Sequence, residues 1–147
     1  MEIKVRLDEG ATMPIRAHET DAGYDLFARE DFYVFHSTMK KNKVNVGYAI
    51  HDTGVHIEIP KGYVGFLKSK SGLNVKHGLT SEGVIDSGYT GSIVVKLYNH
   101  TKRGYFVHKG DKITQLVILP IATPKLKQVD SLDETERGDG GFGSTGR

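Results

Sequence analysis

The stretch Val55-His-Ile-Glu-Ile-Pro-Lys-Gly-Tyr-Val-Gly-Phe-Leu67 shows the architecture of the chain most clearly. From residue 55 to residue 59, three β-branched residues alternate with two polar ones, which is the pattern of a strand with one buried face. Pro60-Lys-Gly62 is typical of a turn, and the apolar residues 63–67 follow it directly. The stretch therefore predicts a strand, a turn and a second strand.

The same alternation recurs elsewhere, at residues 3–7 and 44–48. Further β-branched or aromatic runs lie at Phe32 to Phe35, Ile93 to Tyr98 and Ile113 to Ile121. Apolar residues nowhere keep a helical spacing for three turns, so we expect one short helix at most, after Ser71 and around Leu73 to His77. Many short strands with frequent turns predict an all-β fold, a jelly-roll-like barrel or sandwich.

The bulk composition fits one domain of 147 residues without cysteine, which excludes disulfides and thiolate chemistry. The formal net charge is +2, and its one basic cluster, Lys40-Lys41-Asn42-Lys43, is interpreted as a solvated loop rather than a nucleic-acid site. We expect a cytoplasmic protein, or one of the host cytoplasm if the gene is viral, with neither a nucleic-acid nor a membrane partner. We also expect a folded body over residues 1–130 and a flexible arm over residues 131–147.

The last eleven residues, Arg137-Gly-Asp-Gly-Gly-Phe-Gly-Ser-Thr-Gly-Arg147, are too rich in glycine to pack as a strand or helix. Glycines let backbone N–H groups turn toward an anion, Arg137 can neutralise phosphate oxygens, and Phe142 can stack on a flat ring. A disordered, solubilising terminus is the alternative. We interpret the segment as a lid that closes over a nucleotide.

Two segments of the body combine glycine with charge near a strand end. In Asp21-Ala-Gly-Tyr-Asp25, a glycine permits a tight turn and Asp25 stands in an otherwise apolar strand; a carboxylate that caps its own backbone is the alternative. In Gly65-Phe-Leu-Lys-Ser-Lys-Ser-Gly-Leu73, the strand ends in a cation, a hydroxyl and a glycine, namely Lys70, Ser71 and Gly72. This order suits a phosphate seat before a helix, although an ordinary serine cap explains Ser71 almost as well.

Two further segments carry polar groups on expected strands. Gly83-Val-Ile-Asp-Ser-Gly-Tyr-Thr-Gly-Ser-Ile93 has the pattern of a hairpin that holds Asp86 and Tyr89. If the hairpin opens at its end, its backbone can imitate a complementary base, Tyr89 can wall off a sugar, and Asp86 can take a proton from water; a plain turn with a solvent-facing carboxylate is the alternative. In Lys109-Gly-Asp-Lys-Ile-Thr-Gln-Leu-Val117, Gln115 needs partners if buried, and either a phosphate or a neighbouring strand can supply them.

Taken in order, the five segments resemble the five motifs of the trimeric dUTP pyrophosphatases, or dUTPases, from about Ala22 to the C-terminus. One motif alone is weak evidence, whereas the ordered set is highly specific. The matching stretches are Ala22-Gly-Tyr-Asp-Leu26, Ser69-Lys-Ser-Gly-Leu73, Gly83-Val-Ile-Asp-Ser-Gly-Tyr89, Gly110-Asp-Lys-Ile-Thr-Gln115 and Arg137-Gly-Asp-Gly-Gly-Phe-Gly-Ser-Thr145.

The resemblance implies a jelly-roll-like subunit in a homotrimer whose active sites are shared between subunits and covered by the tail of one chain. It implies hydrolysis of dUTP to dUMP and pyrophosphate, which keeps uracil out of DNA and supplies dUMP for thymidylate synthesis. Mg²⁺ would be held by substrate phosphates and water, not by direct protein ligands. Asp86 would orient and deprotonate the water that attacks the α-phosphorus, with Asp25 as its neighbour in space.

The resemblance also assigns substrate contacts. The triphosphate would contact Lys70, Ser71, Gly72 and Gln115 of the body, together with Arg137, Gly143, Ser144 and Thr145 of the tail. Uracil would be read by hairpin backbone at Gly83, Val84, Ile85 and Val94, with Phe142 stacked over it. Tyr89 beneath the deoxyribose would leave no room for a ribose 2′-hydroxyl.

The sequence departs from the family's pattern at two motif positions. Lys70 stands where motif two usually carries arginine, and Gly88 where motif three commonly carries an acidic residue. Ser87-Gly88-Tyr89 is similar to the related dCTP deaminases, but Lys96 stands where those enzymes need a glutamate. A dCTP deaminase and a dUTP-sensing regulatory protein on the same fold are the alternative functions.

Overall fold

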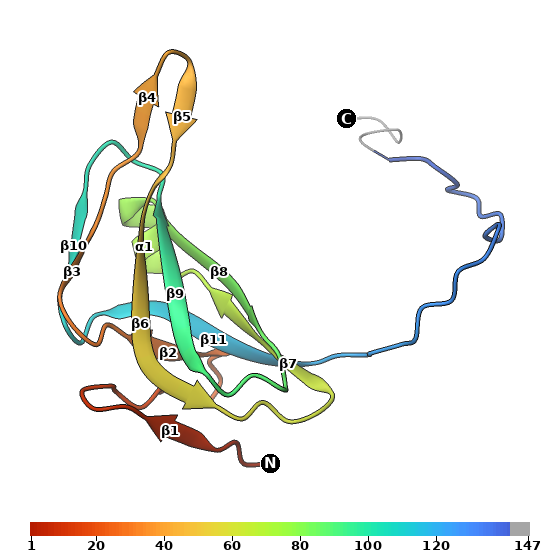
Figure 1. The fold of residues 1–147 in the computed structure, drawn as a ribbon, viewed down its shortest axis with the longest axis horizontal. Coiled ribbons are helices and arrows are strands. Elements are labelled where there is room, and N and C mark those ends of the chain that lie inside the picture. Colours follow the sequence, from red (N-terminus) through yellow and green to blue (C-terminus); the bar gives the residue numbers. More distant parts are fainter. Residues whose placement is uncertain (142–147) are drawn as a thin grey trace.

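A seven-stranded antiparallel sheet in the order β1-β6-β9-β8-β7-β11-β2 forms the body of the protein (Figure 1). The computed structural model describes residues 1–141. The strands of this sheet are β1 (Val5–Leu7), β2 (Gly23–Phe27), β6 (Gly47–Ile57), β7 (Tyr63–Lys68), β8 (Leu79–Ile85), β9 (Ser92–Asn99) and β11 (Lys112–Pro120). Two small sheets pair β3 (Phe32–Val34) with β10 (Tyr105–Val107) and β4 (Thr38–Lys40) with β5 (Lys43–Asn45).

The sheet curls around one apolar core, because alternate residues of its strands point inward. In β9, Ile93, Val95 and Leu97 are almost completely buried, while Val94 between them is 49% exposed. Leu26, Val55, Leu67, Val107, Ile113 and Leu116 belong to the same core cluster. The predicted all-β, jelly-roll-like fold is confirmed.

A bulge bends β6, the longest strand, part-way along its length. The pairing of β6 with β9 shifts register between Asp52 and His56, and Gly54 within the bulge has φ +67°. A Cβ at Gly54 would also lie 3.0 Å from Ala11, so glycine suits both the backbone and the space there. The bulge directs β6 toward β1 and brings the N-terminal strand onto the edge of the sheet (Figure 1).

The predicted short helix is α1 (Ser71–His77), between β7 and β8. Lys70 precedes it in an extended conformation, and Gly78 ends it in the left-handed region with φ +63°, where its N–H donates to the carbonyl of Asn74. The helix thus begins shortly after β7 ends at Lys68, and its first turn lies at the end of the sheet.

The prediction of a half-buried strand over residues 44–48 is wrong. The segment is divided between β5 and β6, and Val44, Val46 and Tyr48 are 62%, 41% and 48% exposed. Strands β4 and β5 form a hairpin that projects from the body (Figure 1), with Lys41 and Asn42 both at positive φ in its turn. Both faces of a projecting two-stranded ribbon meet solvent in the single chain, so alternation there does not report burial.

The C-terminal arm leaves the sheet after β11. The last strand ends at Pro120, and the chain from 121 to 141 runs away from the body with most of its side chains exposed (Figure 1). The expected boundary near residue 130 stays a prediction. Within the part of the chain that the structure describes, no helix has the length and apolar character needed to cross a membrane.

Candidate active site

A buried carboxylate between two lysines lies at one end of the sheet. Asp25 in β2 is 4% exposed. Its Oδ2 lies 2.8 Å from Nζ of Lys112 at the start of β11, and its Oδ1 pairs with Nζ of Lys70 just before α1. Three segments far apart in the sequence therefore converge on one side chain, which confirms the expectation of a negative group inside an apolar strand.

The two lysines determine the ionisation of Asp25. Burial alone would raise its pKa, but hydrogen bonds and charge attraction from Lys112 and Lys70 outweigh burial and lower the pKa below the usual value. Asp25 is therefore ionised at neutral pH and balances one of the two cations. The remaining positive charge suits an anionic ligand, since Lys112 and Lys70 keep 42% and 27% of their side-chain surface open to solvent.

Gln115 lies opposite Asp25 in the β11–β2 register, and Gly23 makes room for it. Its Nε2 donates to the backbone carbonyl of Ser69 at 3.1 Å. A Cβ at Gly23 would lie 2.7 Å from the Gln115 Oε1, so a larger residue would displace the amide. The sequence left either a phosphate or a neighbouring strand as the partner of Gln115, and in the structure the partner is the backbone of Ser69.

Ser71 and Gly72 form the exposed first turn of α1 beside this cluster. The N-cap residue is Lys70, without a side-chain capping bond, so the alternative of Ser71 as the helix cap is wrong. A Cβ at Gly72 would meet nothing within 4 Å, which leaves the approach to the backbone of this turn open. The hydroxyl and the first-turn N–H groups are thus accessible at the same end of the sheet as Lys112.

The predicted hairpin opens at its end. Strands β8 and β9 pair from Leu79↔Asn99 to Ser81↔Leu97 and then separate. Beyond that point, β8 continues alongside β7 through Ile85, and β9 continues alongside β6 through Ser92 (Figure 1). The backbone edges of Gly83–Ile85 and of Val94 thus face each other without joining in a ladder.

Asp86 and Tyr89 lie on the turn that closes this opening, and both are exposed. The Tyr89 N–H donates to the Asp86 carbonyl at 3.0 Å, and its hydroxyl donates to the Ser92 carbonyl at 2.8 Å. The ring lies close over Gly91, where a Cβ would be 2.5 Å from the hydroxyl oxygen. The aromatic ring is therefore fixed across the mouth of the hairpin.

Within one chain, the structure does not bring Asp86 beside Asp25. Gln115 pairs with both Asp25 and Lys68, at one end of β7, whereas Ile85, directly before Asp86, pairs with Gly65. Three residues of strand correspond to roughly 10 Å. The polar residues of a single subunit therefore form two separate groups, the Asp25 cluster and the hairpin turn.

Of the predicted site residues in the tail, Arg137 lies within the described residues. Arg137 is exposed, and its Nε donates to the Gly140 carbonyl at 2.8 Å, away from both groups. Phe142, Gly143, Ser144 and Thr145 lie outside the described residues.

Lys112 is a candidate site residue that the sequence motifs did not single out. It lies within the Gly110–Gln115 segment, at the first position of a strand whose neighbour carries Asp25. The signal was a cation three residues before Gln115, but the pairing of β11 with β2 was needed to place it against Asp25.

The curled antiparallel sheet places the protein in the class of jelly-roll-like β proteins. A cationic cluster lies at one end of the sheet and an opened hairpin at the other. A family model described as dUTPase matches residues 9–146. The chain belongs to the dUTPase family.

Individual relatives agree with this membership. The mouse deoxyuridine 5′-triphosphate nucleotidohydrolase is 45% identical over 144 residues, which cover 97% of this chain and 83% of the mouse protein. The dUTPase of Staphylococcus bacteriophage 80alpha, solved with dUPNHPP, superposes with a TM-score of 0.86 at 35% identity and covers 99% of both chains. That structure is described with the statement that phage dUTPases control transfer of virulence genes by a G protein-like mechanism.

A third similar structure concerns a metal ion. A point mutant of the dUTPase from the Staphylococcus aureus phage phi11 has a TM-score of 0.77 at 34% identity, over 89% of this chain and 98% of that one, and is described as revealing the coordination of a structural Mg(II) ion. In this protein, residues 1–141 contain no group of three or more His, Cys, Asp or Glu side chains suited to hold a metal.

Proposed function

We propose that the chain hydrolyses dUTP to dUMP and pyrophosphate, which keeps uracil out of DNA and supplies dUMP for thymidylate synthesis. The observation that carries the proposal is the pair of preformed groups in a dUTPase-family chain: a lysine-rich phosphate site around Asp25 and a hairpin that opens at its end. A cytoplasmic location stays a prediction.

The two groups belong to one active site only if two copies of the chain meet. The separation of Asp86 from Asp25 along β7 supports a site shared between subunits, as in the homotrimer that we propose. Apolar side chains on the outer face of the sheet support it as well, since Tyr48, Ile50 and Val94 are about half exposed. Along the arm, Leu126 and Leu132 are exposed too and suit packing against another copy.

The triphosphate is proposed to lie between the lysines and the first turn of α1. Lys70 and Lys112 supply charge, and Ser71 and the backbone at Gly72 supply hydrogen-bond donors. Gln115 adds a side-chain amide to the same cluster. Because lysine is a point charge, Lys70 holds phosphate with less fixed geometry than an arginine fork would. Arg137 of the tail, with Gly143, Ser144 and Thr145, is proposed to close over the β- and γ-phosphates.

The base is proposed to enter between the separated strands. Backbone groups of Gly83, Val84, Ile85 and Val94 can pair with uracil, and cytosine would leave a donor and an acceptor unmatched, at about 1–3 kcal/mol for each. Tyr89, fixed by its bond to the Ser92 carbonyl, lies where it can exclude a ribose. Phe142 is proposed to cover the base once the lid, residues 131–147, closes on the body, residues 1–130.

The proposed chemistry is attack of water on the α-phosphorus, with Asp86 as the general base. Exposure of the Asp86 carboxylate lets it reach a substrate held by another subunit, while Asp25 keeps Lys70 and Lys112 in place. Both Asp25 oxygens already accept from lysine, so the residues fit a metal that arrives on the triphosphate better than one in a protein cage. Bound Mg²⁺ would neutralise phosphate charge during the displacement.

The test is pyrophosphate release by the purified protein from dUTP, dCTP, dTTP and UTP in the presence of Mg²⁺. We expect turnover of dUTP in strong preference to the other three, and equal release from all four would contradict the proposed base reading. Asp86→Asn should lose at least roughly 10²-fold in kcat while still binding a non-hydrolysable dUTP analogue. Full turnover by that variant would show that Asp86 is not the base.

The two alternative functions are separable from hydrolysis. A dCTP deaminase is disfavoured because Lys96 packs over the rings of Tyr48 and Tyr98, at 4.2 and 4.8 Å, and carries no carboxylate; ammonia release from dCTP would revive it. A dUTP-sensing role is favoured by the similarity to the 80alpha phage protein. For that role, Asp86→Asn would retain ligand-dependent effects on a partner after turnover is lost.

A further inference from the structure

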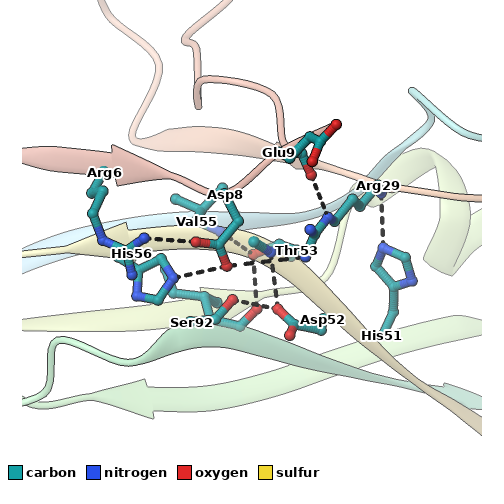
Figure 2. A network of polar contacts seen from close by, with 12 residues as sticks. Arg6, Asp8, Glu9, Arg29, His51, Asp52, Thr53, Val55, His56 and Ser92 are labelled. Carbon is teal, nitrogen blue, oxygen red and sulfur yellow. Dashed lines mark hydrogen bonds and ion pairs between the residues drawn. The ribbon is translucent and has the colours of Figure 1, made fainter.

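A network of polar contacts joins β6 to Asp8 and to Ser92 at the start of β9 (Figure 2). His56 on β6 is at its centre, and 13% of its side chain is exposed. Its Nδ1 lies 2.8 Å from the carbonyl of Thr90, the residue after Tyr89. Its Nε2 lies 3.1 Å from Oδ2 of Asp8, which follows β1.

Both partners of the His56 ring accept hydrogen bonds. A backbone carbonyl and an ionised carboxylate have no proton to give, so each contact needs an N–H on the ring. The imidazolium satisfies both contacts, whereas either neutral tautomer leaves one nitrogen lone pair facing an oxygen. The charged ring is therefore the form that fits this site.

The surrounding charges agree with that form. The Thr90 carbonyl and the Asp8 carboxylate raise the pKa of His56, against opposing effects of burial and of Arg6. His56 and Arg6, in turn, lower the pKa of Asp8. The other charged groups that face the network are Arg29, at 4.0 Å from Asp8, and Asp52, which accepts from the Ser92 hydroxyl.

The network holds the return side of the hairpin at two points. His56 faces Ser92 in the β6–β9 register and reaches past it to Thr90, while Asp52 accepts from Ser92 itself. Asp8 is fixed to the bulge of β6, because its N–H donates to the Gly54 carbonyl at 2.8 Å. The turn from residue 86 to residue 91 is thereby connected to the edge strand β1.

We propose that His56 is a positioning residue for dUTP hydrolysis: as the imidazolium, it links the Thr90 carbonyl to the Asp8 carboxylate and so fixes the turn that carries Asp86 and Tyr89. The inference rests on the proposed roles of those two residues. Loss of the ring proton breaks one of the two links, so the turn is held less firmly at higher pH. Substrate that meets a looser turn binds less well and places the attacking water less accurately.

The first experiment is the pH profile of kcat/KM for dUTP, between about pH 5 and pH 9. In the wild type, kcat/KM should fall as the pH rises and His56 loses its ring proton; this falling part of the profile is the His56 limb. His56→Gln keeps a donor for Thr90 but does not titrate, so it should lower kcat/KM roughly ten-fold at low pH and remove that limb. Asp8→Asn should move the limb to lower pH, because it removes the carboxylate that favours the charged ring.

A matched control is His108→Gln, since His108 also lies near a carboxylate, 3.7 Å from Asp111, but in the loop between β10 and β11 and not against the hairpin turn. Its profile should keep the wild-type limb. A wild-type limb in His56→Gln, or an unmoved limb in Asp8→Asn, would overturn the proposal.

The second experiment reports on the turn without catalysis. In ¹⁵N NMR spectra of substrate-free protein, the amides of Gly88 and Gly91 should shift with the titration of His56 in the wild type and lose that shift in His56→Gln. Identical glycine titrations in both proteins would overturn the link. Because no turnover is needed, this result separates a failure of the His56 proposal from a failure of Asp86 as the base, which Asp86→Asn measures by itself.

Discussion

Asp25 is an ionised carboxylate withdrawn from water, and its two lysine partners make that burial tolerable. The same arrangement leaves the lysines in position for a phosphate. A single side chain thus connects the stability of the sheet end to the proposed binding of substrate.

Asp25→Asn should lower the free energy of unfolding by about 1–3 kcal/mol at pH 7, because it leaves two lysines without their carboxylate. The pKa of Asp25 is lowered in the folded state from a usual value of 3.8. Its stabilising contribution is therefore complete above pH 3.8 and is lost as the pH falls through the lower, folded value. Urea unfolding at several pH values should show the difference between variant and wild type shrink in acid.

Glu82→Gln is the control for this measurement. Glu82 also pairs with a lysine, Lys68, but it is 66% exposed, so its removal should change stability little at any pH. A constant difference for Asp25→Asn down to about pH 2 would contradict the ionised pair.

Gly23→Ala tests the close contact between β2 and Gln115. The new methyl group would lie 2.7 Å from the Gln115 Oε1 and 3.1 Å from its Cβ, so the amide must rotate away. We expect a KM for dUTP raised roughly ten-fold with the sheet intact. In Gln115→Ala the same glycine change should cost less, since the amide is already gone; equal costs in both backgrounds, measured as a double-mutant cycle, would refute the coupling.

At this scale, the sequence predicted which polar residues belong to the candidate site, but not which of them contact one another. Asp25, Lys70 and Gln115 follow from their places in an ordered set of motifs, whereas the contact of Lys112 with Asp25 depends on the pairing of β11 with β2. His56 falls in an ordinary alternating pattern, and its link to Thr90, 34 positions away, depends on the bulge in β6. Pairings over such separations are not visible in local pattern.

Among the elements, the β4–β5 hairpin is the least connected to the site. Its strands, Thr38–Lys40 and Lys43–Asn45, pair with each other, and most of its side chains are exposed. Ser37, directly before β4, connects the hairpin to the body. Its hydroxyl donates to the Asn99 carbonyl and accepts from the Gly47 N–H.

Replacing residues 38–45 by a short glycine linker should leave kcat and KM for dUTP within about two-fold, because exposed loops tolerate changes of length. Ser37→Ala in the full chain is the contrasting variant, and it should lower the melting temperature by removing a part-buried junction. A large loss of activity on deleting the hairpin would show that it contributes to the site or to assembly.

Elements were predictable wherever alternation meant burial. The strands β7, β9 and β11 occur where the sequence placed them, because each has side chains in the core. The helix α1 does so as well, because a glycine ends it. The 44–48 stretch failed because β-branched residues there do not pack inward in the single chain.

The whole molecule poses a problem that no local pattern contains, since its two polar groups cannot meet within one chain. Their separation along β7, the exposed apolar face of β6 and β9 and the outstretched arm all support the proposed site shared between copies of the chain. The homotrimer was expected from resemblance alone, and the geometry of the single chain gives a physical reason to propose it.

Two truncations should separate the roles of the arm. Removing residues 137–147 should lower kcat/KM for dUTP at least roughly 10²-fold and leave the assembly unchanged, since the proposed phosphate and base contacts of the tail are lost but Leu126, Val129 and Leu132 remain. Removing residues 121–147 also takes away those apolar side chains, and it should weaken association in sedimentation-velocity measurements over a range of protein concentrations. Full activity after removal of residues 137–147 would contradict the lid. If removal of residues 121–147 leaves the sedimentation coefficient unchanged at all concentrations, the subunits are held by the sheet face of β6 and β9 instead.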